Sequence, residues 1–258
     1  MTAFTLEIRK YQNSRLSYVV LGLAGFLSLW LAILVIIGAA RAVPGPQTTL
    51  TMALYNFIGL ITLLMGPAVA ILAGRVAGVD QEERMGQFYR ALGQSPLQQF
   101  LIKLTLLTIL AGFVNFSMLL VGITVGAHAG LGGAPSYGAS CWPVVALTLA
   151  ATLAVSAVQL ALASIFDQPS AGVVVGIAGS LVATFTPFLN IPALAWALPW
   201  GLTTAATPYL PEARQFEGNS DFLLVRNPGL LAGIALIVAI IWTAIAAWFT
   251  AHLEEKSR

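Results

Sequence analysis

The sequence predicts an all-α integral membrane protein that forms one transmembrane domain over residues 1–258. Hydrophobic residues make up 58% of the chain and charged residues only 9%, against about 45–50% and about 25% in an average soluble domain. So few charged residues would leave a soluble protein of this length without enough polar surface, so lipid must solvate much of it. Five long stretches contain no Asp, Glu, Lys or Arg: 16–40, 42–74, 104–166, 168–211 and 227–253.

These uncharged stretches predict six membrane spans, because one spanning helix needs about 20 apolar residues. The third stretch is long enough for two helices and is interrupted between Gly130 and Pro135. The first apolar run is longer than the 7–15 residues typical of a signal peptide, so we expect it to be retained. The expected spans are 17–39, 52–76, 101–126, 143–166, 171–189 and 229–251.

The basic residues predict the orientation, because short cytoplasmic loops are enriched in Lys and Arg. With the N-terminus in the cytoplasm, nine of the twelve basic residues fall on the cytoplasmic side and three outside. We therefore expect both termini to be cytoplasmic. The nine are Arg9, Lys10, Arg15, Arg75, Arg84, Arg90, Lys103, Lys256 and Arg258; the three are Arg41, Arg214 and Arg226.

Four of the prolines in residues 190–228, before the last span, forbid a continuous helix. The residues between the first prolines are nevertheless too apolar for a solvated loop, with Trp196 and Trp200 among them. Irregular backbone at membrane depth is tolerated where protein covers it. We therefore expect a proline-broken or re-entrant segment on the outer side. The prolines are Pro192, Pro199, Pro208 and Pro211.

The first cytoplasmic loop combines charges with apolar residues at helical spacing. This pattern predicts a short amphipathic helix over about 82–92, which ends near Gly93 and Pro96. A cytosolic partner would bind its charged face, or the helix is solvated and has no partner. The apolar positions are Met85, Phe88, Tyr89 and Leu92.

A second amphipathic pattern precedes the first span. Phe4, Ile8 and Tyr11 share one helical face, next to Glu7 and Lys10. This arrangement is typical of an interfacial elbow helix that lies along the inner membrane surface. An ordinary basic flank of the first span is the alternative.

Three uncharged polar residues, Asn56, Asn115 and Gln159, fall within the expected spans. Such side chains usually form hydrogen bonds between helices, or they line a transport pathway. Glycines spaced four apart predict close helix packing. These pairs are Gly74/Gly78, Gly122/Gly126, Gly172/Gly176 and Gly229/Gly233.

The sequence contains no motif that supports catalysis or a metal site. Cys141 is the single cysteine, and His128 and His252 fall on opposite predicted sides of the membrane. None of the three lysines follows glycine, so the chain lacks the G-x-x-x-x-G-K-[ST] nucleotide-binding loop. No run of Lys and Arg suggests a nucleic-acid partner. We expect no catalytic residues and no metal.

Short stretches of the chain resemble permease subunits of the ABC-2 class of ABC transporters, particularly those of lantibiotic immunity and export systems. The matching stretches are Glu7-Ile8-Arg9-Lys10, Asp80-x-Glu82-x-x-x-Gly86, Leu92-x-x-Ser95-Pro96 up to Lys103, and Leu198-Pro199-Trp200-Gly201. The resemblance covers most of the chain in topology and only these stretches in sequence.

The resemblance implies a subunit of an exporter in a bacterial plasma membrane, with antimicrobial peptides as substrates. Its partners would be a cytosolic ABC ATPase dimer, which binds ATP and Mg, and a second permease; lantibiotic systems favour a different one over an identical copy. The 82–92 helix would be the coupling helix, and the turn at Asp167-Gln168 a second contact. The implied coupling residues are Asp80, Glu82, Glu83, Arg84, Gly86, Phe88, Arg90, Asp167 and Gln168.

Two other functions stay open at this stage. An ion-coupled secondary transporter generally needs an ionisable residue near the bilayer centre, and no Asp or Glu falls in the middle of an expected span. A non-transporting membrane scaffold would have no need of the charged 82–92 helix. Both alternatives therefore fit the sequence less well than an ATP-driven exporter.

Overall fold

A computed structural model describes residues 16–41, 50–82, 95–131, 137–166, 169–189, 191–211, 222–225 and 227–256. Within these residues, six helices are long and apolar enough to cross a membrane. The chain is thus an α-helical, multi-pass membrane protein, as its composition predicts. The six are α2 (Leu16–Arg41), α3 (Thr51–Glu82), α5 (Pro96–His128), α6 (Tyr137–Ile165), α7 (Pro169–Leu189) and α10 (Pro228–Lys256).

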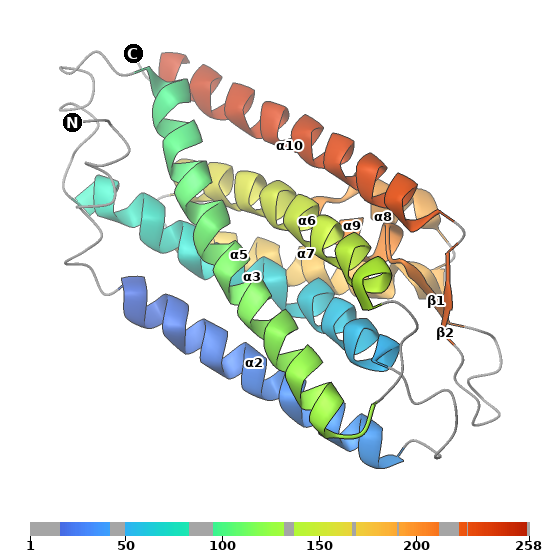
Figure 1. The fold of residues 1–258 in the computed structure, drawn as a ribbon. Coiled ribbons are helices and arrows are strands. Elements are labelled where there is room, and N and C mark those ends of the chain that lie inside the picture. Colours follow the sequence, from blue (N-terminus) through green and yellow to red (C-terminus); the bar gives the residue numbers. More distant parts are fainter. Residues whose placement is uncertain are drawn as a thin grey trace.

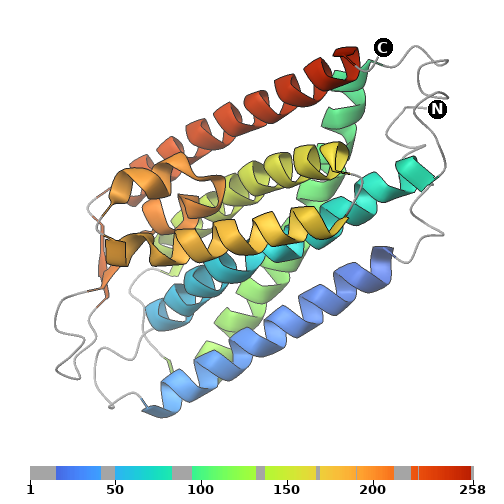
Figure 2. The same ribbon diagram turned by 180° about the vertical axis from the view of Figure 1, so that it is seen from behind.

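The six helices run up and down in one bundle (Figures 1 and 2). At one end α2, α5 and α7 begin and α3, α6 and α10 end; we call this the Pro96 end. The opposite end, where α7 terminates, is the Leu189 end. Helices α3 and α6 are central, with 67% and 72% of their most apolar stretches buried, against 28–39% for the other four. Helix α3 packs against α7, α6, α5 and α2.

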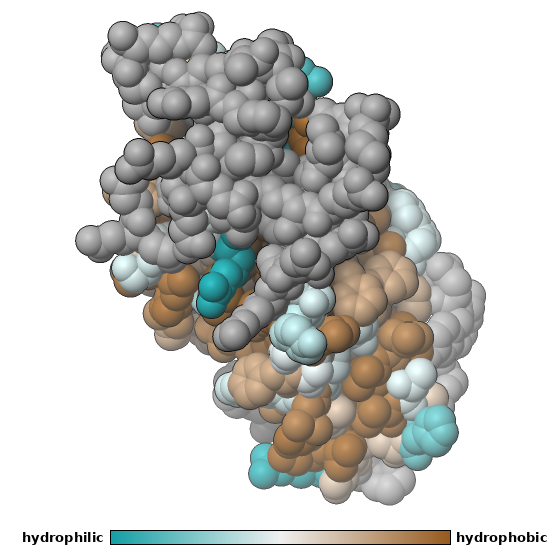
Figure 3. Space-filling view, turned by 90° about the vertical axis from the view of Figure 1, so that its left-hand side faces the viewer, coloured by the Kyte–Doolittle hydropathy of each residue, from teal (hydrophilic) through white to brown (hydrophobic). Residues whose placement is uncertain are grey.

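The outward faces of the peripheral helices carry large exposed hydrophobic side chains, among them Phe26 on α2, Phe116 on α5 and Ile237 on α10. Seen from the Pro96 end, hydrophobic residues cover much of the described surface (Figure 3). Apolar side chains on both the inside and the outside of a bundle are expected where lipid is the solvent.

Helix α3 extends well past its apolar part. Its 32 residues give a length of about 48 Å at 1.5 Å per residue, whereas the hydrocarbon core is about 30 Å thick. The apolar stretch ends at Gly78, and the helix continues through Asp80 to Glu82. The predicted span of 52–76 agrees with this apolar stretch. The sequence does not predict that the same helix continues through 77–82, where no proline interrupts it.

The residues that follow α7 form short helical pieces, as their prolines predict. They are α8 (Pro192–Ala197), the 3-10 turn η1 (Pro199–Gly201) and α9 (Leu202–Ala205). Strands β1 (Tyr209–Pro211) and β2 (Phe222–Leu224), which the sequence does not predict, then pair antiparallel with Tyr209 opposite Leu224. We call residues 191–209 the broken segment. Its short helices fold back between α7 and α10 (Figure 2).

Glycines bring α3 and α7 into backbone contact. A Cβ atom on Gly176 would lie 2.7 Å from the carbonyl oxygen of Gly66, and one on Gly66 would lie 2.5 Å from the carbonyl oxygen of Gly176. Close packing is therefore confirmed at Gly176, and also at Gly126, where a Cβ would lie 3.1 Å from Leu50. The same prediction is wrong for Gly78 and Gly233, whose Cβ positions meet nothing within 4 Å.

We expect Gly66→Ala to destabilise the protein by about 1–3 kcal/mol, because its methyl group must displace the backbone of α7 or the Trp200 ring. Gly59→Ala in the same helix is the matched control, since its Cβ meets no atom within 4 Å. That change should be neutral or stabilise by up to about 1 kcal/mol through helix propensity. Unfolding of both variants in mixed micelles measures the difference, and equal stability of the two would contradict the α3–α7 contact.

Candidate functional site

The structure describes only part of the predicted site. Asp80 and Glu82 lie in the last turns of α3, at the Pro96 end. The three polar residues of the spans are described and lie apart, since Asn56 faces Gly38 of α2 whereas Asn115 and Gln159 are buried at different helix contacts. The remaining predicted residues lie outside the described ones: Phe4, Glu7, Ile8, Lys10, Tyr11, Glu83, Arg84, Gly86, Phe88, Arg90, Asp167 and Gln168.

Asn115 has hydrogen-bond partners on two neighbouring helices. Its side-chain nitrogen donates to the Thr152 hydroxyl at 2.9 Å and lies 3.7 Å from the sulfur of Met65. The Thr152 hydroxyl in turn donates to the carbonyl oxygen of Thr148 at 2.6 Å. Asn115 therefore connects α5 to α6 and α3, which is the structural role that polar side chains usually have between membrane helices.

Gln159 is buried without such partners. Its side chain is 0% exposed, and neither the amide nitrogen nor the amide oxygen forms a hydrogen bond to the described residues. The amide faces α7, because its nitrogen lies 2.9 Å from where a Cβ on Gly176 would be, and its oxygen 3.6 Å from the same point on Gly172. A buried polar group left without a partner costs about 1–3 kcal/mol. An unpartnered polar side chain of this kind marks Gln159 as a candidate for function.

Further buried polar atoms without a hydrogen bond occur in the described residues. Hydroxyl groups carry less weight than the Gln159 amide, because Ser and Thr can rotate to bond a carbonyl of their own helix. The indole nitrogen of Trp200 has no such option. These atoms are the hydroxyls of Ser28, Thr108, Ser156 and Ser180 and the indole nitrogen of Trp200.

The tip of the broken segment packs Trp200 into a notch between α3 and α7. A Cβ on Gly179 would lie 2.5 Å from the Trp200 ring, and a Cβ on Gly66 would lie 2.9 Å from it and also contact the Ser180 hydroxyl. Pro199 favours the extended Leu198 before it (φ −94°, ψ 134°). The next residue, Gly201, lets the turn contact the Ala195 backbone. The run Pro199-Trp200-Gly201 thus positions one indole ring against two glycines.

Threonine hydroxyls provide the polar contacts of this segment. The hydroxyl oxygens of Thr62 on α3 and Thr203 on α9 are 2.7 Å apart and share a hydrogen bond. The Thr204 hydroxyl donates to the carbonyl oxygen of Ala183 on α7 at 3.3 Å, and the Thr186 hydroxyl donates to the same oxygen at 2.6 Å. These hydrogen bonds link the segment to α3 and α7.

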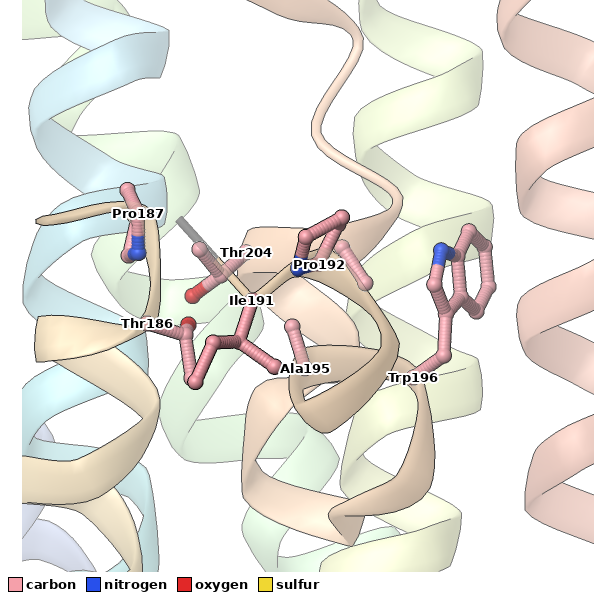
Figure 4. A pocket seen from close by; sticks show the side chains of 8 residues that line it. Thr186, Pro187, Ile191, Pro192, Ala195, Trp196 and Thr204 are labelled. Atoms are coloured by element: carbon pink, nitrogen blue, oxygen red, sulfur yellow. The ribbon is translucent and has the colours of Figure 1, made fainter. Parts of the chain in front are cut away.

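A cavity of about 260 Å³ separates part of the broken segment from α7 at the Leu189 end. Thr186 and Pro187 of α7 line one side, and Ile191, Pro192 and Trp196 line the other (Figure 4). The segment is therefore tightly packed at its Trp200 tip and loosely packed where it leaves α7.

Beyond the cavity, Tyr209 begins β1 with its side chain fully buried. Burial, with a smaller contribution from a negative charge at Cys141, raises the pKa of the Tyr209 phenol above its ordinary value of 10.0. The phenol therefore stays protonated and uncharged at neutral pH.

No group of three or more His, Cys, Asp or Glu side chains that could hold a metal ion occurs in the described residues. The broken segment contains no charged residue, and neither do the parts of α6 and α7 that face it around Gln159 and Ser180. What the arrangement offers chemically is hydrogen bonding by uncharged groups.

Sequence reasoning singled out Gln159 and missed the residues that surround it. The site includes Ser180, Thr203 and the notch that holds Trp200. These residues come together only because α3, α6, α7 and η1 meet at one point, which no spacing along the chain reveals. One signal was available, since an indole flanked by proline and glycine in a broken membrane segment indicates close backbone contact.

We expect Gln159→Leu and Asn115→Leu to change the free energy of unfolding in opposite directions. Leucine at 159 removes two buried polar atoms that have no partner, so stability should be unchanged or rise by about 1 kcal/mol. Leucine at 115 removes a hydrogen bond between helices, which should cost about 1 kcal/mol. Unfolding of both variants in mixed micelles measures the difference; an equal loss for the two would show that Gln159 has a partner.

In the described bundle, the side chain of Asn115 therefore forms hydrogen bonds to its neighbours. The polar atoms around Gln159 lack hydrogen-bond partners, and the tip of the broken segment lies next to them. No family model, curated protein or solved structure matches the chain.

Proposed function

We propose that this protein is the membrane-spanning permease subunit of an ATP-driven ABC exporter, powered by a separate cytosolic ATPase. The observation that carries the proposal is helix α3, which continues without a break from the buried centre of the bundle to the acidic residues Asp80 and Glu82. A partner that binds at the Pro96 end would act on a continuous helix that packs against four of the other long helices.

The path of force along α3 supports this assignment. Asp80 and Glu82 lie beyond the apolar part of the helix, and the contacts at Gly66 and Thr62 lie near the middle of it. Packed helices transmit displacement because their interiors are dense and hard to compress. A push at Glu82 would therefore reach both the α3–α7 crossing and the broken segment.

The energy source is expected to be external to the chain. The sequence has no nucleotide-binding loop of the G-x-x-x-x-G-K-[ST] type, so ATP and Mg would be bound by the partner ATPase. An ion-coupled carrier is the weaker alternative, because no Asp or Glu lies between Thr51 and Gly78 of α3 or in the apolar parts of the other five helices. A non-transporting scaffold would gain nothing from the charged extension of α3.

The partners are expected at the Pro96 end. Helix α2 begins and α10 ends there, in keeping with two termini on one side, and the bias in basic residues supports a cytoplasmic position for that side. The 82–92 helix would contact one ATPase of a dimer, and Asp167 and Gln168 would make a second contact with it. A second permease, a different subunit rather than an identical copy, would complete the exporter in a bacterial plasma membrane.

An amphipathic antimicrobial peptide of the lantibiotic type is the proposed substrate, expelled to protect the cell. The resemblance in the 198–201 and 80–96 stretches supports this class. An uncharged, hydrogen-bonding interior around Gln159 also suits the peptide groups of such a substrate better than it suits an ion.

A charge reversal tests the coupling. Glu83→Lys should abolish co-purification with an ABC ATPase co-expressed as its partner, and it should reduce the stimulated ATP hydrolysis of that ATPase at least tenfold. The reason is that the substitution reverses the charge that the ATPase would recognise. Glu255→Lys is the matched control, an equal change near the end of α10 at the same side of the bundle, and it should leave both measurements unchanged.

Both variants should insert into the membrane in normal amounts, which membrane fractionation checks. ATPase association that survives Glu83→Lys would count against the coupling role of the 82–92 helix. Peptide export that continues without any ATPase and follows an ion gradient would establish the carrier alternative instead.

A further inference from the structure

We infer that the broken segment is a removable stopper, and that its withdrawal opens a water-filled, uncharged hydrogen-bonding site around Gln159 to the Leu189 end of the bundle. The inference rests on the proposed function in so far as it identifies this site with the exporter's pathway. It goes beyond that function by naming the element that closes the pathway and the residues beneath it.

The geometry of the tip supports a stopper. Trp200 occupies a notch that exists only because Gly66 and Gly179 lack side chains, with the ring 2.5 Å from where a Cβ on Gly179 would be. Ser180 is the next residue of α7, and its hydroxyl lies at the same notch. One to two turns further toward the Pro96 end, Gly176 and Gly172 face the amide of Gln159. The indole therefore covers Ser180 and Gln159 from the Leu189 end.

The groups beneath the tip indicate what the open site binds. The Gln159 amide both donates and accepts hydrogen bonds, and neither of its polar atoms has a partner among the described residues. The Ser180 and Ser156 hydroxyls also lack a hydrogen-bond partner among the described residues. All three side chains are uncharged. Water and neutral polar groups such as the peptide group would satisfy them, whereas an ion would find no countercharge.

Neutral hydroxyl groups attach the segment to its neighbours. Thr203 shares a hydrogen bond with Thr62 of α3, and Thr204 donates to the Ala183 carbonyl oxygen of α7. The cavity next to Pro192 leaves its outer part loosely packed against α7. Because α3 provides both Thr62 and Gly66, a displacement of α3 would disturb the hydrogen bond and the Trp200 seat together.

A cysteine reporter tests the stopper in the full chain, in nanodiscs that expose both membrane faces and without any ATPase. Cys141→Ser removes the native thiol, and Ser180→Cys places a near-isosteric one under Trp200. The probe is the charged, water-soluble reagent 2-(trimethylammonium)ethyl methanethiosulfonate, and mass spectrometry of the peptide containing residue 180 measures its rate of labelling. The reporter alone should react slowly, since Ser180 is fully buried.

Adding Gly179→Ala should displace the Trp200 ring and raise the labelling rate at least tenfold. Gly112→Ala in α5 is the matched control, because a Cβ there meets no atom within 4 Å, and it should leave the rate unchanged. Labelling that is the same with alanine at 179 as with glycine would overturn the inference.

A reversible lock keeps the test decisive if Gly179→Ala folds poorly. Thr62→Cys with Thr203→Cys replaces hydroxyls 2.7 Å apart by thiols that can form a disulfide. When oxidised, this pair should reduce labelling at residue 180 at least tenfold relative to its reduced form. Reduction with dithiothreitol, which is removed before the reagent is added, should restore the labelling. Equal labelling of the oxidised and reduced forms would overturn the inference that the broken segment closes the site. Because no ATPase is present, that failure would leave the proposed coupling at Glu83 untouched.

Discussion

The backbone contact between Gly66 of α3 and Gly176 of α7 is the constraint on which the rest of this bundle depends. Lipid provides no hydrophobic force between membrane helices, so close packing and interhelical hydrogen bonds must hold them together. Two glycines let the helices approach until each carbonyl oxygen occupies the space that a side chain on the other would need. The same approach creates the notch for Trp200, and so it fixes both the α3–α7 pair and the position of the broken segment.

Helix α3 connects the two ends of the molecule. It is central, it packs against α2, α5, α6 and α7, and it continues past its apolar part to the charged residues at the Pro96 end. Pro67 lies next to the glycine crossing and removes one hydrogen bond of the helix there. The helix is thus continuous over its whole length yet weakened at the point where the contacts to α7 and to the broken segment meet, which suits an element that transmits movement and also bends.

Much of the fold was predictable from the sequence, and much of the candidate site was not. Charge-free stretches located all six helices, and prolines predicted that the residues after Leu189 would not form one helix, because both signals act locally along the chain. The end of α3 was placed too early, since the charges of Asp80 and Glu82 were interpreted as a loop although charge alone does not end a helix. Gln159 was found by its polarity. Its lack of partners was not predictable, because Asn115 has the same polarity and is satisfied only through Thr152 on another helix.

The uncharged character of the broken segment has an electrical consequence. No residue from Ile191 to Tyr209 carries a formal charge, and burial keeps the Tyr209 phenol protonated. Moving one elementary charge through a membrane voltage of 100 mV involves about 2.3 kcal/mol, but a neutral segment exchanges almost none of that energy when it shifts. The voltage across a living cell's membrane would therefore neither drive this part of the protein nor hold it in place.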